Sequence, residues 1–209
     1  MSRPNQQTGQ VDDPPESLLI RPASWTQQLD PASFSNPDRP LEVDVGCGKG
    51  RFLMARSAAH SETDFLGIDR LLRRLRKIDR KLQRRGSTNV RLLRIEALYA
   101  IEHLLPPLCV TTFYVFFPDP WPKRRHHRRR LFSNTFLDAL YRILLPAGRI
   151  HVATDNGDYF EQIRGVFAGD ERFEEEPAFV PSDQERSDFE LIFLAQGGNI
   201  GRIVNVSLC

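Results

Sequence analysis

The sequence predicts an α/β fold built on a doubly wound, mostly parallel sheet of seven strands with helices on both faces. Three observations support this prediction. Short apolar runs alternate with amphipathic helical patterns from residue 41 to residue 167, as they do in βαβ units. A glycine-rich turn follows the first apolar run, and a proline-rich segment ends a later one. The length of 209 residues suits one such domain with a full-sized core.

The expected elements follow one another along the chain. Helices are assigned where apolar residues recur every three or four positions, and strands where a short apolar run lies between turn residues. Strands are expected at 41–45, 64–69, 89–95, 112–117, 149–154, 172–176 and 200–206. Helices are expected at 51–60, 70–85, 97–105, 132–145 and 156–167. Pro146 should end the fourth of these helices, because proline has no backbone N–H to donate. Residues 183–195 fit either a helix or a strand.

The first 40 residues differ from the rest in composition. They contain seven of the fifteen prolines and show little periodicity. We expect a mobile leader up to about Ser17, followed by an irregular arm that packs on the domain. The domain itself is expected to cover residues 41–209.

Composition restricts the class of protein. Hydrophobic residues make up 40% and charged residues 27%, an ordinary mixture for a soluble domain. No segment approaches the roughly 20 apolar residues that span a bilayer, and the first thirty residues have no apolar core of the signal-peptide kind. Cys47, Cys109 and Cys209 are far apart and odd in number, a pattern that predicts neither a zinc site nor a disulfide framework. We therefore expect a cytoplasmic protein that neither spans nor binds a membrane.

The cations are concentrated in two short segments. The net charge is only +2, yet residues 70–85 contain nine Lys or Arg and residues 123–130 contain six. Acidic residues gather elsewhere, with nine between positions 170 and 190. Polyanions respond to a local field of this kind, so the distribution indicates a nucleic acid partner.

A proline-rich segment, Pro118-Asp119-Pro120-Trp121-Pro122, ends the apolar run at 112–117. Alternating prolines fix φ and remove backbone donors, so neither a strand nor a helix can continue through them. The result is a stiff loop at the carboxyl end of a strand, which is the edge of an open α/β sheet where ligands bind. The loop presents a carboxylate, an aromatic ring and the cations that follow, as a site for a nucleobase on a polynucleotide would.

A glycine turn follows the first strand. Gly46, Gly48 and Gly50 allow a sharp turn and close approach of a ligand to the backbone. The spacing G-x-G-x-G differs from the dinucleotide pattern G-x-G-x-x-G and favours S-adenosylmethionine over NAD. Asp69 ends the second strand, where an acid can accept hydrogen bonds from both ribose hydroxyls of an adenosine. A tight turn without any ligand is the alternative reading of the glycines alone.

Two further acids complete an adenosyl site. Asp44 precedes the glycines and could reach the methionine ammonium, while Glu96 ends the third strand, where an adenine amino group would lie. Each carboxylate alone could be a solvated loop acid. Acids at the ends of three consecutive strands favour an adenosyl cofactor, and a nicotinamide-dependent oxidoreductase is disfavoured by the glycine spacing.

The two basic segments differ in how strongly they indicate RNA. Residues 123–130 follow the stiff loop directly, so phosphate contact is expected there. The helix over 70–85 could equally be a solvated face. His126 and His127 have no Asp, Glu or Cys at metal spacing, so we expect no metal site.

With these motifs in view, the chain resembles the bacterial tRNA (guanine-N7)-methyltransferase family, which has the class I, Rossmann-like methyltransferase fold. The resemblance runs from about residue 40 to residue 206 and is most specific in the proline-rich loop. The matching motifs are Asp44-Val45-Gly46-Cys47-Gly48-Lys49-Gly50, Gly67-Ile68-Asp69, Phe117-Pro118-Asp119-Pro120-Trp121-Pro122-Lys123, Ala153-Thr154-Asp155 and Ser187-Asp188-Phe189-Glu190.

The resemblance implies a function and a set of roles. It implies methyl transfer from S-adenosylmethionine to N7 of a guanine in tRNA, at guanine-46 of the variable loop. Asp119 would be the catalytic acid and would also line the cofactor pocket. The other cofactor residues would be Asp44, Gly46, Gly48, Gly50, Asp69 and Glu96, and the substrate residues Lys123, Asp155, Ser187 and Glu190. Asp44 and Asp69 stand where many members have Glu, and Glu96 where Asp is usual; the charge is kept while the reach changes.

Two other functions remain open at this point. A methyltransferase acting on an exocyclic amine of another nucleic acid uses a similar Asp/Asn-Pro-Pro-aromatic loop. A catalytically silent RNA-binding protein of the same fold is the second alternative. The sequence leaves open whether the protein is a monomer or a homodimer.

Overall fold

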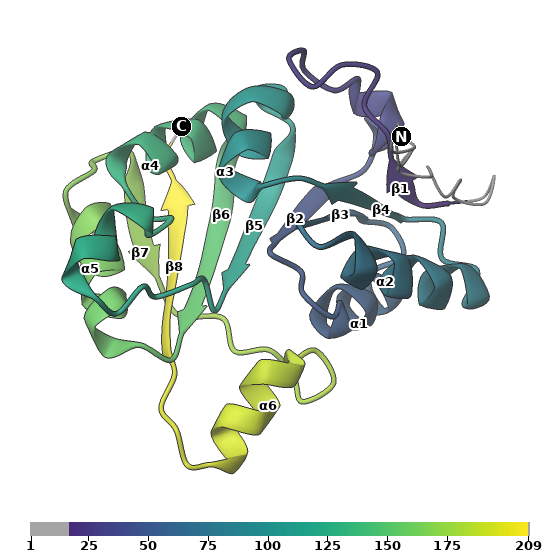
Figure 1. Cartoon of the computed structure of the whole chain (residues 1–209). Helices are drawn as coiled ribbons and strands as arrows, with labels where there is room; N and C mark the ends of the chain where they lie inside the picture. Colours follow the sequence, from purple (N-terminus) through teal and green to yellow (C-terminus); the bar gives the residue numbers. More distant parts are fainter. Residues whose placement is uncertain (1–16, 209) are drawn as a thin grey trace, which may run out of the picture.

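The computed structural model describes residues 17–208, in which eight strands form a single sheet (Figure 1). The strand order is β1-β4-β3-β2-β5-β6-β8-β7. All pairs from β1 to β6 are parallel, whereas β8 is antiparallel to both β6 and β7. The strands are β1 (Leu19–Ile20), β2 (Leu41–Val45), β3 (Asp64–Asp69), β4 (Val90–Arg94), β5 (Val110–Phe116), β6 (Leu144–Thr154), β7 (Phe173–Glu176) and β8 (Gly201–Ser207).

Helices cover both faces of this sheet. Six are α-helical, and the third continues as a π-helical turn (Ala100–Leu104). They are α1 (Arg51–Ala59), α2 (Leu72–Arg84), α3 (Ala97–Tyr99), α4 (Asn134–Ile143), α5 (Gly157–Ala168) and α6 (Asp188–Ala195). Within residues 17–208, no helix is both long and apolar enough to cross a bilayer.

The core has two parts. A smaller cluster contains Leu53 of α1 together with Leu75, Ile78 and Leu82 of α2, all with 0% exposure. A larger cluster contains the apolar faces of α4 and α5, the π-helical turn, and Phe34 of the N-terminal arm. Apolar strands therefore alternate with amphipathic helices as predicted, and the helices bury the strands on both faces of the sheet.

Several predictions need correction. The predicted seven strands are present, but an eighth, β1, pairs in parallel with Leu92 and Leu93 of β4. The helix before β6 stops at Ile143, and Pro146 lies within β6 rather than after a helix, in an irregular start where the register with β5 shifts. Residues 183–195, left open between helix and strand, contain α6.

The N-terminal arm is fixed to the sheet from Ser17 onward. The carboxylate of Asp79 in α2 accepts from the Ser17 hydroxyl at 2.9 Å and from the Leu18 N–H at 3.0 Å. Further along the arm, Leu29 donates its N–H to the carbonyl of Leu104 at 2.8 Å. The described part of the arm therefore contacts α2 and the π-helical turn. The predicted mobile leader lies outside the described residues.

The order of the strands reverses beside β2. From β2 the chain moves outward to β3 and β4, then returns to β5 on the other side of β2. The carboxyl ends of β2 and β5 therefore flank the switch point, where ligands bind in open α/β sheets. The glycine turn follows β2 and the proline-rich loop follows β5, so the topology brings the two predicted motifs together.

Candidate active site

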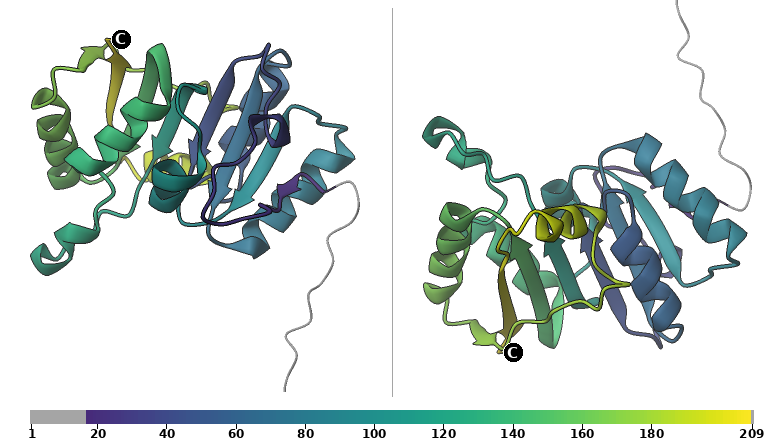
Figure 2. Two further views of the ribbon diagram at one scale, coloured as in Figure 1. Left: turned by 90° about the horizontal axis from the view of Figure 1, so that it is seen from above. Right: turned by 90° about the horizontal axis from the view of Figure 1, so that it is seen from below.

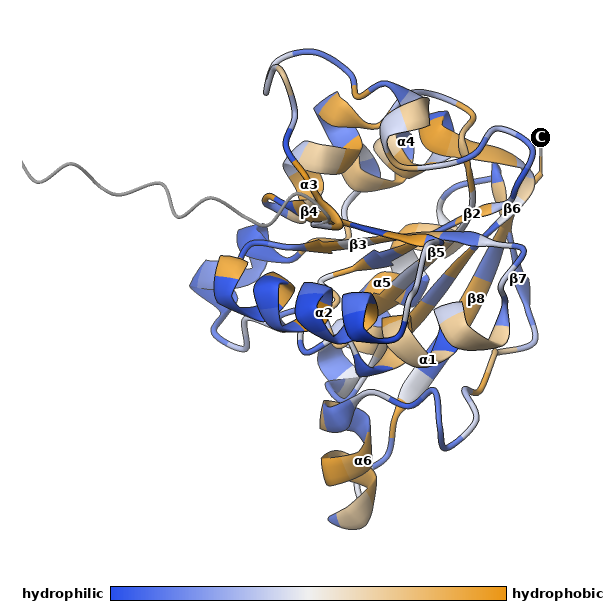
Figure 3. Cartoon of the chain, turned by 90° about the vertical axis from the view of Figure 1, so that its right-hand side faces the viewer, coloured by the Kyte–Doolittle hydropathy of each residue, from blue (hydrophilic) through white to orange (hydrophobic). Residues whose placement is uncertain are grey.

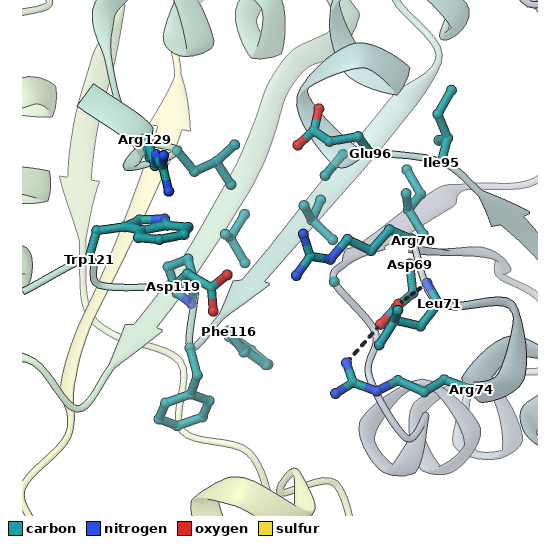
Figure 4. A pocket seen from close by; sticks show the side chains of 18 residues that line it. Asp69, Arg70, Leu71, Arg74, Ile95, Glu96, Phe116, Asp119, Trp121 and Arg129 are labelled. Atoms are coloured by element: carbon teal, nitrogen blue, oxygen red, sulfur yellow. Dashed lines mark hydrogen bonds and ion pairs between the residues drawn. The ribbon is translucent and has the colours of Figure 1, made fainter. Parts of the chain in front are cut away.

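Two adjoining pockets lie at this switch point. The first, of about 380 Å³, is bordered by the ends of β3, β4 and β5, and the second, of about 600 Å³, by the glycine turn and α6. Gly46, Arg74 and Asp119 line both. Figure 4 shows Asp119, Trp121 and Arg129 on one wall of the first pocket, facing Asp69, Arg70 and Arg74. The structure thus places the two predicted motifs in one crevice.

The glycine turn is held by backbone bonds and leaves space on its pocket side. Gly46 has φ +77°, and a Cβ added there would meet no atom within 4 Å. Its N–H donates to the carbonyl of Ile68 at 2.8 Å. At Gly50, with φ +75°, an added Cβ would lie 2.6 Å from Ile78 Cγ1, so this glycine lets α2 approach. The turn is therefore rigid where it packs and open where a ligand would lie.

Asp69 is buried and oriented by the backbone. Its Oδ1 accepts from the Leu71 N–H at 2.7 Å and its Oδ2 from the Gly48 N–H at 3.1 Å. Arg74 Nη1 lies 3.4 Å from the same Oδ2. Oδ1 has a second lone pair, so the group still has acceptor capacity for a ribose hydroxyl. Asp69 thus links the glycine turn to α2 and fits the predicted role.

Asp44 is the more unusual carboxyl. It is 5% exposed, lines the second pocket, and makes no side-chain hydrogen bond with residues 17–208. Burial, reinforced by the negative charge of Asp69, raises the pKa of Asp44 to about 7. A buried carboxyl without a partner beside a pocket is suited to a cation such as an ammonium group. This observation supports the fit of the site to a methionine moiety.

The Glu96 carboxylate also caps a helix. It is the N-cap of α3, and its Oε2 accepts from the Tyr99 N–H at 2.9 Å. It also lines the first pocket, together with Ile95 and Ala97. The cap fixes the carboxylate and leaves the other oxygen for an adenine amino group. Among the described residues, no group of three or more His, Cys, Asp and Glu side chains could hold a metal ion.

The proline-rich loop is strained and anchored. Phe117 and Trp121 have positive φ values of 55° and 43°, a conformation that costs a non-glycine residue about 1–3 kcal/mol. The Phe117 N–H donates to the carbonyl of Ala153 at 2.7 Å, and its ring lies 4.9 Å from that of Phe189 in α6. Arg129 stacks its guanidinium 4.9 Å over the Trp121 ring. These contacts hold Asp119 between the two pockets.

Arg130 has a structural role that the sequence did not reveal. By sequence it is one of the six cations of 123–130, where phosphate contact is expected, yet it is 7% exposed. Its guanidinium donates to the Pro120 carbonyl at 2.8 Å, to Gln162 Oε1 at 2.6 Å and to Asp158 Oδ2 at 2.6 Å. Nothing in a run of arginines distinguishes the one that turns inward. The structure makes it the link between the loop and α5.

Of the four predicted substrate residues, two line the second pocket and two line neither pocket. Asp155 and Ser187 line the second pocket, and the Ser187 hydroxyl also caps α6 by accepting from the Glu190 N–H at 3.1 Å. Lys123 is exposed beside the Arg124–Arg129 turn and lines neither pocket. Glu190 has 0% exposure and pairs with Arg186 and Arg202, so its carboxylate faces the interior instead of a pocket.

Residues 177–187 form a strap that connects β7 to α6 and positions α6 beside the second pocket. Arg51, the first residue of α1, donates to the Arg186 carbonyl at 2.9 Å. Arg56 bridges Glu185 at 3.2 Å and Glu42 of β2 at 3.0 Å. Phe189 and Ile192, at the pocket end of α6, are 48% and 58% exposed. Arg51 and Arg74 are pocket residues that sequence reasoning missed, because each looks like an ordinary cation on a helix surface.

Comparison with known proteins extends over most of the chain. Residues 38–198 match a family described as "Putative methyltransferase". Relatives named tRNA (guanine-N(7)-)-methyltransferase include one from Nitrosospira multiformis, 38% identical over 142 residues, covering 68% of this chain and 62% of the relative. Another, from Halorhodospira halophila, is 35% identical over 170 residues, covering 79% of this chain and 74% of the relative. The relative from Nocardia farcinica is 37% identical, and the match spans 54% of its length.

Solved structures show the same fold at low sequence identity. The antibiotic-resistance methyltransferase Kmr aligns with a TM-score of 0.56 and 17% identity, covering 82% of this chain and 87% of that one. A SAM-dependent O-methyltransferase from Thermotoga maritima aligns with a TM-score of 0.53 and 17% identity, covering 82% and 61%. The fold is therefore that of SAM-dependent methyltransferases, and by the sequence matches the chain belongs to the tRNA (guanine-N(7)-)-methyltransferase family.

Proposed function

We propose that this protein transfers a methyl group from S-adenosylmethionine to N7 of a guanine in tRNA and so forms 7-methylguanosine. The three relatives compared above are named for this activity. The matched part of the chain spans 62%, 74% and 54% of their own lengths. The observation that carries the proposal is the position of Asp119, which lines both pockets at their junction. Within tRNA, guanine-46 of the variable loop is the proposed target, on the strength of the family resemblance.

The chain's own residues suit the cofactor. Asp69 would accept from the ribose hydroxyls, Glu96 from the adenine amino group and Asp44 from the ammonium, with Gly46 and Gly48 providing the close backbone approach. Bound S-adenosylmethionine supplies an electrophilic methyl group on a sulfonium. The raised pKa of Asp44 in the free protein means that a bound cation would favour its ionised form.

The reaction places few demands on proton transfer. Guanine N7 has a free lone pair, so no base has to remove a proton before the methyl group is attacked. Positioning and water exclusion therefore supply most of the rate. The guanine ring becomes positively charged, and the fixed carboxylate of Asp119 would stabilise that charge as it develops. The same carboxylate could accept from N1–H and the exocyclic amine and so select guanine; we propose at least one of these roles.

The remaining pocket residues would hold the nucleoside. Asp155 and Ser187 line the second pocket beside Asp119 and would accept or donate hydrogen bonds to the guanosine. Lys123 would contact a phosphate, and Glu190 would act indirectly by fixing the start of α6 through its ion pairs. Extruding a base from the stacked tRNA costs a few kcal/mol, which backbone contacts offset. The proposed tRNA substrate implies a cytoplasmic location, where free thiols such as those of Cys47 and Cys109 are usual.

The deciding experiment identifies the methylated nucleoside. The protein is incubated with tRNA and methyl-labelled S-adenosylmethionine, and the nucleosides are separated after digestion. We expect 7-methylguanosine from the wild type and a loss of at least about 100-fold in turnover from Asp119→Asn. A methyl group on an exocyclic amine would identify the rival methyltransferase, and cofactor binding without any product would identify a silent RNA-binding protein. Wild-type turnover by Asp119→Asn would refute the role of this residue.

A further inference from the structure

The outward face of α2 carries an unbroken row of cations. Leu75, Ile78 and Leu82 have 0% exposure, so the helix is fixed with its opposite side to solvent. The exposed cations of this segment are Arg70, Arg73, Arg74, Lys77, Arg80, Lys81, Arg84 and Arg85. Figure 3 shows α2 as hydrophilic over most of its visible surface. The row follows from the helical period, because positions 73, 77, 80 and 84 lie opposite the apolar stripe.

The one acid of this helix does not neutralise that face. Asp79 is 3% exposed and points inward, where it accepts from Ser17, from the Leu18 N–H and from Gln83 Nε2 at 2.8 Å. Among residues 17–208, Arg74 is the one exposed cation of this segment with an ion-pair partner, which is Asp69. Like charges four residues apart destabilise a helix. Within the described residues, this row is therefore left largely without neutralising acids, which is unfavourable for folding, and a polyanion would relieve the repulsion.

The row begins at the active site. Arg70, Leu71 and Arg74 line the first pocket, and Arg129 lines its opposite wall (Figure 4). From there the 13 residues of α2 extend about 20 Å away from the pocket. The Arg124–Arg129 turn projects from the body of the protein on the side away from α2, as both views of Figure 2 show. Two basic surfaces thus flank the place where the target base would lie.

We propose that the exposed face of α2 is a second docking surface for RNA phosphates, which holds tRNA on the opposite side of the active site from residues 123–129. This inference rests on the proposed function. A membrane surface is the less suitable polyanion, because the apolar side of α2 is buried in the core and cannot enter lipid. A row of single charges along a helix matches a row of phosphates instead, and makes no demand on base sequence.

The test replaces two cations that lie far from the chemistry. Arg73 and Lys77 are exposed, line neither pocket and lie one turn apart on α2. The double variant Arg73→Gln/Lys77→Gln keeps helix propensity, since Gln is as good a helix former as Lys or Arg. The matched control, Arg149→Gln/Arg164→Gln, removes the same charge at side chains that are 47% and 50% exposed on β6 and α5.

Three measurements separate docking from catalysis. Binding of tRNA is measured by mobility shift at several salt concentrations, S-adenosylmethionine binding by calorimetry, and methylation by steady-state kinetics. For the α2 variant we expect the Kd and KM for tRNA to rise on the order of tenfold, with kcat and cofactor Kd unchanged. The slope of log Kd against log salt should fall by about 1.4 to 1.8, the contribution of two phosphates. The control should resemble the wild type.

Other outcomes overturn the inference. Equal losses in the α2 variant and the control would mean that only net charge matters, and an unchanged salt slope would mean that α2 touches no phosphate. Binding to vesicles of anionic phospholipid that is tighter than binding to tRNA, and lost in the α2 variant, would assign the face to a membrane. Failure of the proposed function can be told apart from failure of this inference, because the wild type would then bind tRNA without forming 7-methylguanosine.

Discussion

The substitution Arg130→Ala should loosen the proline-rich loop that carries Asp119, because it removes the hydrogen bonds that connect this loop to α5. Arg130 donates to the Pro120 carbonyl next to Asp119 and to Gln162 of α5, and it stacks 4.8 Å over the Tyr159 ring. Hydrogen bonds from a charged donor contribute about 1.5–3 kcal/mol each, although the loop partly relaxes when they are lost. We therefore expect a destabilisation of about 2–3 kcal/mol, or about 4–12 °C in Tm for a domain of this size.

The effect on catalysis should exceed the effect on stability. Displacement of a catalytic group by about 1 Å can lower the rate about 100-fold, and the strained loop has a tendency to relax once its anchor is removed. We expect kcat to fall by about that factor while the cofactor Kd stays within about twofold, because the glycine turn and Asp69 do not contact Arg130. Thermal unfolding, calorimetry and single-turnover methylation measure the three quantities.

Arg128→Ala is the matched control. Arg128 stands two residues away in the same run and is exposed. Removing it deletes the same charge without deleting a contact to the loop. The same Tm and the same kcat in the two variants would refute this role, because Arg130 would then act only as one more surface cation.

Four further predictions follow from the site. Lowering the pH from 8 to 6 should weaken S-adenosylmethionine binding, because the pKa of Asp44 is about 7 and the protonated carboxyl cannot pair with the ammonium. Calorimetry measures this binding, and the variant Asp44→Asn should bind weakly at both pH values. The folded pKa exceeds the ordinary value of 3.8, so stability falls as the pH rises from about 4 to 7, and Asp44→Asn should unfold at a higher temperature than the wild type at pH 8. Gly50→Ala should cost more than the about 1 kcal/mol of a positive-φ glycine alone, because its Cβ would also meet Ile78; Gly86→Ala, at φ +65° with nothing within 4 Å, is the control in urea unfolding. Arg51→Ala should raise the KM for tRNA severalfold at unchanged cofactor Kd, since it frees the strap next to Ser187; an unchanged KM would mean that the strap is held by Arg56 alone.

The parts that were predictable from sequence rest on local patterns. Glycines at 46, 48 and 50 and the prolines around Asp119 determine turns by their own conformational limits, and the alternation of elements determines the order of the parallel strands. These rules suffice to bring Asp44, Asp69 and Asp119 to one edge of the sheet.

The parts that were missed depend on contacts between distant residues. β1 has only two residues, and it exists because Asp79 holds its start and β4 offers a free edge. The direction in which Arg130 or Glu190 points depends on partners 28 and 12 residues away, which periodicity cannot reveal. Propensity assigned Pro146 to a helix stop, whereas Pro146 lies in the irregular part of β6 between Leu144 and Arg149, the two residues that pair with Val110 and Thr112 of β5.

The strap also determines how a large substrate can approach. Arg51 and Arg56 fasten residues 185 and 186 to the helix that follows the glycine turn, so the crevice is closed on that side by covalent chain and ion pairs together. A tRNA bound as we propose would then come from the opposite direction, across the gap between α2 and the Arg124–Arg129 turn. The base would reach Asp155 and Ser187 by passing Asp119, so RNA could enter and leave while the strap stays fastened to α1.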